Sequence, residues 1–133
     1  ATVIPALINK ISSAKKQNEK SISIWGDGTP TRDFLYVQDA VRGLMLAAEK
    51  YDEGLPINLG SDQETTINEL VNLISKITGF KGQIKWDKSK PNGQPRRKVS
   101  NKLAEEKLGF KSETTLEEGL QKTIEWFQKH IPK

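Results

Sequence analysis

Residues 25–34 read WGDGTPTRDF, and this stretch decides the fold because a Gly-x-Gly can have two structural meanings. It can begin the phosphate-binding turn of a dinucleotide fold, which needs a third glycine and a helix directly after it. It can instead be a tight turn, because glycine adopts the positive φ angles that turns require. Thr31 stands where the third glycine would be, and Pro30 leads into an aromatic, β-branched stretch. We therefore predict that Gly26 and Gly28 form a turn and not a phosphate cradle.

The segments around this turn alternate between strand patterns and helix patterns. SISIW at 21–25 alternates polar and apolar residues, as a half-buried strand does. DFLYV at 33–37 is aromatic and β-branched, and LPINLG at 55–60 and QIKW at 83–86 are similar short apolar stretches, so each predicts a strand. Apolar residues recur at helical spacing in 3–14, 40–48, 67–77, 103–108 and 116–127. The expected class is α/β, with small sheets and about five helices.

Local signals mark where several of these helices begin and end. Two capping boxes precede helical segments, namely Thr66 with Glu69 and Thr115 with Glu118. Gly79 and Gly109 suit the left-handed residue that ends a helix. Ser100 is expected as an N-cap, and Asp39 is expected near the positive end of the second helix.

Composition limits the classes of protein that this chain can be. It has 133 residues, 35% hydrophobic and 29% charged, with a net charge of +4, which indicates one modest globular domain. Cysteine is absent and His130 is the single histidine, which excludes disulfides, thiolate metal sites and multi-histidine metal sites. No signal peptide or membrane-length apolar run is visible, so we expect a cytoplasmic protein. The chain begins with Ala in place of Met, which indicates a piece of something longer.

Two basic segments raise the question of what they bind. One is Arg32, at a turn-to-strand junction. The other holds six basic residues against the single acid Asp87: Lys85, Lys88, Lys90, Arg96, Arg97 and Lys98. If both face one cleft they could clamp a diphosphate, since arginine forks match phosphate oxygens. A solvated basic face fits the composition equally well.

The pattern W-G-x-G-x-x-x-R-D-F-x-x-V-x-D runs from Trp25 to Asp39, with VIPALI before it and INLGS and KPNGQPRR after it. With these motifs nearly the whole chain resembles the C-terminal half of the extended short-chain dehydrogenases/reductases, the NAD(P)-dependent nucleotide-sugar epimerases and dehydratases. VIPALI, WGDGTP and KPNGQPRR are most similar to the GDP-L-fucose synthase branch. The resemblance implies that residues 1–133 are the substrate-binding lobe of a Rossmann-type enzyme.

The resemblance also implies roles for individual residues. Arg32 falls on the family's arginine that contacts the diphosphate of the sugar nucleotide. Lys90 falls on a basic residue at the same diphosphate, and Trp25 on a tryptophan that lines the nucleotide pocket. Arg97 is a further candidate for the phosphates. From the residues alone, Trp25 could equally be a core residue, and Arg96 and Arg97 could be solvated.

Motifs of the family's N-terminal half are missing from the chain. There is no Gly-rich cofactor motif and no Tyr-x-x-x-Lys, since Ala40 follows Tyr36 and Leu55 follows Tyr51 at the fourth position. We expect NADP or NAD in the intact enzyme, none bound to this chain, and no catalytic residue here. The histidine that the fucose synthases carry before VIPAL is replaced by Thr2, so either the proton-transfer step differs or the intact enzyme is another nucleotide-sugar epimerase/dehydratase with a different sugar.

The implied partners are a nucleotide-diphosphate sugar, the missing N-terminal Rossmann domain and a second copy of the intact enzyme, with no membrane and no nucleic acid. The helix with Val41, Leu44 and Met45, together with INLG, is expected to face the missing lobe.

Other interpretations compete with this one. A small basic nucleic-acid-binding domain would interleave aromatic and basic residues, yet no aromatic lies between Asp87 and Phe110. An interaction module without a ligand is the third possibility. His130 is expected as a cation at the end of the last helix, and Trp86 and Trp126 as core or cleft-edge aromatics.

Overall fold

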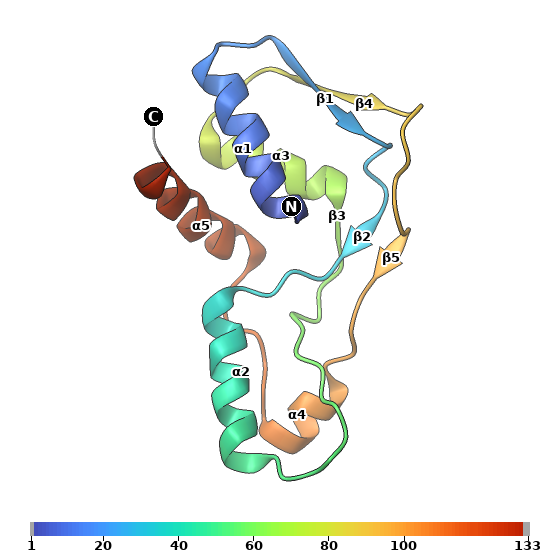
Figure 1. Cartoon of the computed structure of the whole chain (residues 1–133), viewed down its shortest axis with the longest axis vertical. Helices are drawn as coiled ribbons and strands as arrows, with labels where there is room; N and C mark the ends of the chain where they lie inside the picture. Colours follow the sequence, from blue (N-terminus) through green and yellow to red (C-terminus); the bar gives the residue numbers. More distant parts are fainter. Residues whose placement is uncertain (1, 132–133) are drawn as a thin grey trace. The chain divides into compact units, whose positions relative to one another are not determined.

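The computed structural model describes residues 2–131, which divide into two compact units. The first unit takes in the described residues up to 30, residues 66–95 and those from 120 onward, and the second consists of 31–65 and 96–119. Figure 1 shows the elements of each unit along the chain. Both units combine segments that lie far apart in the sequence, so both depend on long-range contacts.

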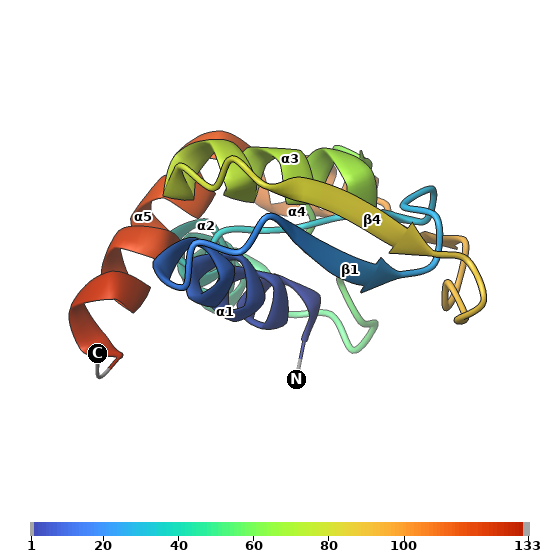
Figure 2. The same ribbon diagram turned by 90° about the horizontal axis from the view of Figure 1, so that it is seen from above.

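The first unit is built on a pair of parallel strands. β1 (Ser21–Trp25) pairs with β4 (Gln83–Asp87) in parallel, from Ser21 opposite Gln83 to Trp25 opposite Asp87. The two strands run side by side in Figure 2. Both were predicted from their patterns, and both are confirmed.

Helices cover the apolar side chains of this strand pair. α1 (Val3–Lys16) packs on β1 and on α3 (Ile67–Thr78), and most of α5 (Leu116–His130) belongs to the same unit. The buried apolar side chains of the unit are Leu7, Ile8, Ile11, Ala14, Ile22, Ile24, Leu70, Val71, Ile74, Phe80, Leu120 and Ile124. The helical spacing in the sequence therefore marked the core faces correctly.

The predicted helix ends are mostly confirmed. α3 begins with a complete capping box of Thr66 and Glu69, and it ends at Gly79 with φ of +80°. Gly109 ends α4 (Lys102–Leu108) with φ of +66°. The expected N-cap at Ser100 is wrong by one residue, because Asn101 occupies that position while the Ser100 hydroxyl accepts a hydrogen bond from the Lys102 amide at 3.3 Å.

The second unit has shorter strands and a smaller core than the first. Its strands are β2 (Thr31–Arg32), β3 (Thr65–Thr66, at the unit boundary) and β5 (Arg96–Arg97), in the order β3-β2-β5, with β2 parallel to β5. α2 (Val37–Lys50) packs on α4. The core consists of the buried Ala104, Leu108 and Phe110 with the partly buried Leu35, Leu46, Ala47, Tyr51, Ile57 and Leu59.

Two strand predictions are wrong. DFLYV forms no strand, because the strand ends at Arg32 and α2 begins at Val37. LPINLG at 55–60 forms no strand either. A strand exists only through pairing, and no neighbouring strand lies beside these stretches within residues 2–131. Their apolar character is used for packing, since Leu35, Ile57 and Leu59 contact the core of the second unit.

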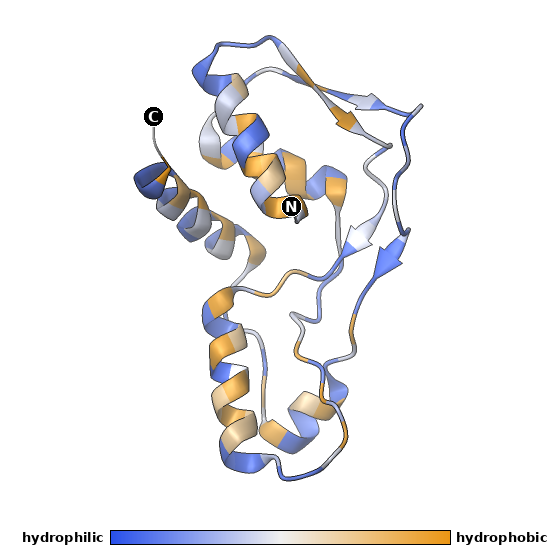
Figure 3. Ribbon diagram, in the orientation of Figure 1, coloured by the Kyte–Doolittle hydropathy of each residue, from blue (hydrophilic) through white to orange (hydrophobic). Residues whose placement is uncertain are grey.

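α2 presents a stripe of exposed apolar side chains. Val37, Val41, Leu44 and Met45 are 63%, 49%, 64% and 60% exposed, at a spacing that places them on one helix face. Apolar residues recur along this helix in Figure 3. Within residues 2–131, no helix is both long enough and apolar enough to cross a membrane.

Candidate functional site

The Gly-x-Gly segment is a turn, as predicted. Gly26 and Gly28 have φ of +92° and +79°, and a strand follows them where a phosphate cradle would need a helix. The Asp27 carboxylate accepts hydrogen bonds from the hydroxyl and the amide of Thr29 at 2.7 and 3.0 Å. These bonds hold the pKa of Asp27 below its ordinary value. The turn is therefore ordered by its own side chains.

Trp25 and Lys90 come together in the first unit. Trp25 is the last residue of β1 and 63% exposed, so the core interpretation of this tryptophan is wrong. The Lys90 ammonium lies 5.6 Å from the centroid of the Trp25 ring, within the range of a cation–π contact. Lys90 follows β4, and its amide donates a hydrogen bond to the Asp87 carbonyl at 3.2 Å. An aromatic surface and a positive charge thus lie together at the C-terminal end of the β1–β4 pair.

Arg32 and Arg97 come together in the second unit. The parallel register of β2 and β5 sets Arg32 opposite Arg97 and Thr31 opposite Arg96. Residues paired in register project to the same face, and successive residues project to opposite faces. The register therefore places the two arginines 32 and 97 on one face of the sheet. Arg32 is partly buried, and its Nη1 donates to the Thr31 carbonyl at 2.7 Å.

Glu64 holds the opposite face of this strand pair. Its carboxylate accepts hydrogen bonds from Arg96 Nε at 2.9 Å, from Arg96 Nη2, and from the Thr31 hydroxyl at 3.0 Å. These bonds, first of all those from Arg96, keep the pKa of Glu64 below its ordinary value, and the same pairing raises the pKa of Arg96. The two arginines of β5 thus project to different faces of the strand pair, and Arg96 is paired with Glu64.

The four predicted site residues are divided between the units. Trp25 and Lys90 belong to the first unit, and Arg32 and Arg97 to the second. The prediction that Arg32 and Lys90 are aimed at a common anion spans both units, and it stays a prediction.

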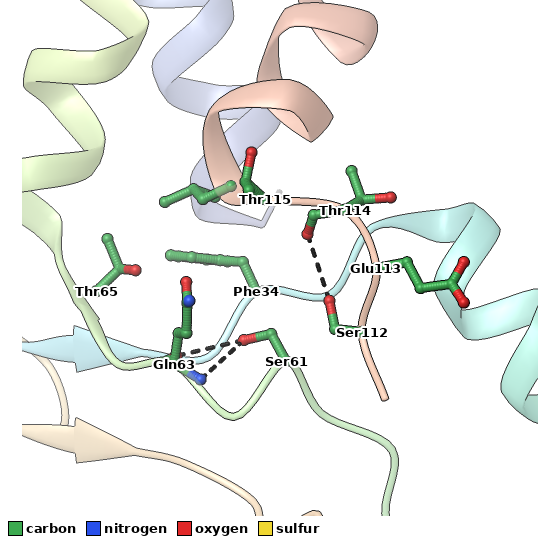
Figure 4. Close-up of a pocket in the computed structure, with 9 residues that line it drawn as sticks. Phe34, Ser61, Gln63, Thr65, Ser112, Glu113, Thr114 and Thr115 are labelled. Carbon is green, nitrogen blue, oxygen red and sulfur yellow. Dashed lines mark hydrogen bonds between the residues drawn. The ribbon is translucent and has the colours of Figure 1, made fainter. Parts of the chain in front are cut away.

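A small polar pocket of about 110 Å³ lies in the second unit (Figure 4). Its lining consists of Phe34, Ser61, Gln63, Thr65, Ser112, Glu113, Thr114, Thr115 and Leu116. The lining contains no lysine or arginine, so it offers no cation to a diphosphate. Hydroxyl and amide groups of this kind suit water or a small neutral polar group.

The remaining candidates have structural surroundings. Thr2 precedes α1 as its N-cap residue without a side-chain cap hydrogen bond. His130 ends α5, as predicted, and its ring stacks on Trp126 with centroids 4.4 Å apart. Trp126 is 58% exposed, so it is not a core residue, whereas Trp86 is half-buried beside Gly28. Across residues 2–131 no cluster of acids and histidine is arranged to hold a metal ion.

Sequence reasoning missed two residues that order the site, Asn92 and Glu64. Asn92 accepts a hydrogen bond from the Asp27 amide at 2.8 Å, across 65 positions in the sequence. Its one signal in the sequence is the dipeptide Asn92–Gly93, which indicates a turn but not the distant partner. Glu64 carries no local signal at all, since its partners lie 32 and 33 positions away.

Comparisons with known proteins agree with the fold and the motifs. Residues 1–60 match the family described as the NAD dependent epimerase/dehydratase family. A GDP-L-fucose synthase of Sinorhizobium fredii is 43% identical over 129 residues, which cover 97% of this chain and 41% of that protein. A probable GDP-L-fucose synthase of Oryza sativa is 36% identical over 129 residues, covering 97% of this chain and 39% of that protein. The chain therefore spans about two fifths of the length of these relatives.

Solved structures give the same result. A GDP-L-fucose synthetase of Naegleria fowleri has a TM-score of 0.89 and 30% identity, covering 98% of this chain and 40% of that one. The UDP-glucose 4-epimerase of Thermotoga maritima, solved with UDP-glucose, has a TM-score of 0.83 and 32% identity, covering 97% and 40%. The α/β class and the resemblance to nucleotide-sugar epimerases and dehydratases are both confirmed.

Proposed function

We propose, from the chain's homology to the NAD-dependent epimerase/dehydratase enzymes, that it is the C-terminal, substrate-binding part of a nucleotide-sugar epimerase/reductase of the GDP-L-fucose synthase type. In this proposal the chain holds the diphosphate of the sugar nucleotide. The observation that carries the proposal is the register of Arg32 with Arg97 on one face of the β2–β5 pair.

The paired arginines suit a diphosphate chemically. Neighbouring strands lie about 4.8 Å apart, so two guanidinium groups in register can each take one phosphoryl group of the same ligand. Glu64 pairs with Arg96 on the opposite face of the strand pair, so Arg96 is held away from the face of Arg32 and Arg97.

Trp25 and Lys90 would serve the nucleoside end of the ligand. The exposed indole offers an apolar surface for a base, and the ammonium beside it offers a second charge for the phosphates. The Thermotoga maritima relative, solved with UDP-glucose, supports a sugar nucleotide as the ligand class. The nucleic-acid alternative is not favoured, because none of the relatives described above is a nucleic-acid-binding protein.

The rest of the proposed enzyme would supply the chemistry. A Naegleria fowleri relative was solved bound to NADP. The chain itself lacks the Gly-rich turn and the Tyr-x-x-x-Lys pair, so NADP or NAD and the hydride transfer would depend on an N-terminal Rossmann domain. The apolar stripe of α2 would pack on that domain, and the intact enzyme would form its homodimer through helices outside this chain.

Titration of the chain with a nucleoside diphosphate tests the arginine pair. Arg32→Ala should weaken binding by roughly 1.5–3 kcal/mol, the range of a charge-assisted hydrogen bond. Arg32→Lys should recover only part of the loss, because the planar fork is gone. Lys102→Ala removes one positive charge from an exposed residue of α4 in the same unit and is the matched control, with a much smaller loss expected. Equal affinities for the parent and Arg32→Ala would return Arg32 to a solvated surface role.

A second test concerns the division of labour. The chain alone should turn over no nucleotide sugar with NADP or NAD, because it carries neither the cofactor motif nor the Tyr-x-x-x-Lys pair. The measurement is the nicotinamide absorbance band with pure chain, cofactor and a sugar nucleotide. Hydride transfer above the blank would overturn the assignment of the chemistry to another part of the protein.

A further inference from the structure

We infer that Asn92 is a positioning residue that holds Lys90 over the face of Trp25, by docking the loop after β4 onto the Gly26–Asp27 turn. The contacts that carry this inference lie within the first unit. Its meaning for ligand binding rests on the proposed function, since Lys90 has a ligand only if the chain holds a sugar nucleotide.

The docking contact joins two loops that are distant in sequence. Asn92 Oδ1 accepts a hydrogen bond from the Asp27 amide at 2.8 Å. The adjacent Gly26 amide donates to the Asp87 carbonyl at 2.9 Å, which extends the β1–β4 pairing by one bond. The turn after β1 is therefore tied to both ends of residues 87–92.

Gly26 makes room for the docked amide. A Cβ built on Gly26 would lie 2.0 Å from Asn92 Oδ1 and 3.3 Å from the Asn92 Cα, and the glycine has φ of +92°. Position 26 thus needs a glycine for its backbone angle and for the side chain seated on it. The fit is specific to this pair, because the three nearest atoms to that Cβ all belong to Asn92.

Lys90 lies between the two tied points. Asp87 fixes the start of the loop, since its carbonyl accepts from the Lys90 amide and its carboxylate accepts from the Ser89 amide at 3.1 Å. Asn92 fixes the other side, two residues beyond Lys90. Both Lys90 and Trp25 are exposed, so burial does not hold the lysine in place. The docked loop supplies the constraint that burial does not.

Ordering a lysine before the ligand arrives has a consequence for affinity. A residue whose backbone is free loses conformational entropy when a ligand fixes it in one place. A loop that restricts the backbone of Lys90 in advance reduces what the ligand must order. We call the hydrogen bond between Asn92 and the Asp27 amide the latch. Loss of the latch should weaken ligand binding without removing any group that touches the ligand.

Nuclear magnetic resonance of the chain tests the latch directly. Protons above an indole ring are shifted upfield, so the Lys90 side chain should stand apart from the other lysines. Asn92→Ala should return the Lys90 shifts to those of exposed lysines and move the Trp25 indole signal. Asn92→Asp keeps an acceptor for the Asp27 amide, and it should lie closer to the parent. Asn72→Ala, an exposed asparagine on α3, is the matched control and should change neither signal.

The same variants separate this inference from the proposed function. If both hold, Asn92→Ala weakens nucleoside diphosphate binding about two- to tenfold, the worth of one neutral hydrogen bond. If Lys90 moves but even the parent chain binds no nucleoside diphosphate, the latch stands and the proposed function fails. If Arg32→Ala weakens binding while Asn92→Ala leaves the Lys90 and Trp25 signals unchanged, the latch is overturned. Equal spectra for Asn92→Ala and Asn92→Asp, with the strands intact, would also overturn the acceptor role.

Should Asn92→Ala disturb the fold, Gly26→Ala gives an independent approach. It leaves Asn92 in place but fills the space that the amide occupies, so the Lys90 shifts should collapse as they do in Asn92→Ala. Because alanine at φ of +92° also strains the turn, Gly28→Ala is the matched control: it introduces a similar strain at φ of +79° without meeting Asn92, and it should leave the Lys90 shifts in place. Equal loss of the Lys90 shifts in both glycine variants would show that strain in the turn, and not the seating of Asn92, moves Lys90, against the inference.

Discussion

The two parallel strand pairs of this chain are held in different ways. β1 and β4 share five register positions, and their unit has a continuous apolar core between helices and strands. β2 and β5 share two positions, both residues of β5 are exposed, and the core beside them is small. A short exposed strand such as β5 can therefore be held in register by polar side chains where little of it is buried.

Polar anchors recur throughout the second unit. Asn101 is 4% exposed, and its Oδ1 accepts from the Gly60 amide at 2.9 Å. Asp33 accepts from the Ser61 amide at 2.9 Å and from the Ser61 hydroxyl. Each anchor joins segments at least 28 positions apart. The loops of this unit are therefore held by individual hydrogen-bonding side chains, whereas the strands and helices of the first unit pack through extended apolar faces.

Asp39 is the most buried of these anchors. It is 3% exposed and accepts hydrogen bonds from the hydroxyl of Ser112 and the amides of Glu113 and Thr114, at 3.2, 3.2 and 3.0 Å. Burial raises its pKa, but these bonds and the one from Arg42 outweigh burial, so the pKa lies below the ordinary value. Its predicted place in the first turn of α2 is confirmed, and the loop anchor is an additional role.

Phe110→Ala should give the largest effect and break the comparison on one side. Phe110 is fully buried and Arg42 lies over its ring at 5.1 Å, so truncation should cost about 3–5 kcal/mol in the second unit. Amide hydrogen exchange should rise around α2 and α4 while β1 and β4 stay protected. Ile74→Ala, in the first core, should give the reverse pattern. Equal loss of protection in both units would mean that they unfold as one.

Asp39→Asn should give a smaller, pH-dependent loss. Replacing a buried acceptor of several hydrogen bonds should cost about 2–3 kcal/mol of unfolding free energy at neutral pH. The folded pKa is depressed, so this contribution is full above the ordinary carboxyl value of about 3.9 and is lost as pH falls through the folded pKa. Denaturant unfolding of parent and variant against pH measures it. A difference that stays constant down to acid pH would refute the role of the charge.

Met45→Glu should give the smallest effect and sharpen the comparison at the surface. The exposed stripe of α2 should make the chain self-associate, and a charge at Met45 should weaken that association by about 1–2 kcal/mol, near the worth of one buried side chain. Sedimentation velocity at several concentrations measures it. Leu55→Glu, on an equally exposed apolar residue outside α2, is the control. A parent chain that stays monomeric at high concentration would contradict the prediction.

Features that depend on residues close together in the sequence could be predicted, and features that depend on distant residues could not. The capping box of Thr66 and Glu69 spans three residues, and the helix faces repeat every few residues, so both are readable locally. SISIW and LPINLG have similar strand patterns, yet only the first has a partner strand in the described chain. The sequence pattern indicates that a segment can form a strand, but whether it pairs with another strand depends on residues elsewhere in the chain.

The candidate site, too, could be predicted only where its sequence signals are local. The turn at Gly26 was predictable because its glycine signal is local, and the family motif marked Arg32 and Lys90 as candidates. The pairing of Arg96 with Glu64 was not predictable, because Glu64 lies 32 positions before Arg96. Asn92 was missed for the same reason.

The charges of β5 alone leave its register against β2 ambiguous. Arg96, Arg97 and Lys98 are three successive cations, so a one-residue slip that sets Arg97 and Lys98 opposite β2 would still present a positive charge at both positions. Charge alone cannot distinguish the correct alignment from the slipped one. Two acids resolve it, because Glu64 binds Arg96 and Asp62 lies 3.8 Å from Lys98. Glu64 and Asp62 are two positions apart in the sequence, as are Arg96 and Lys98, so the two acids select these two cations. Arg97 lies between the two cations and therefore projects to the other face of the strand pair.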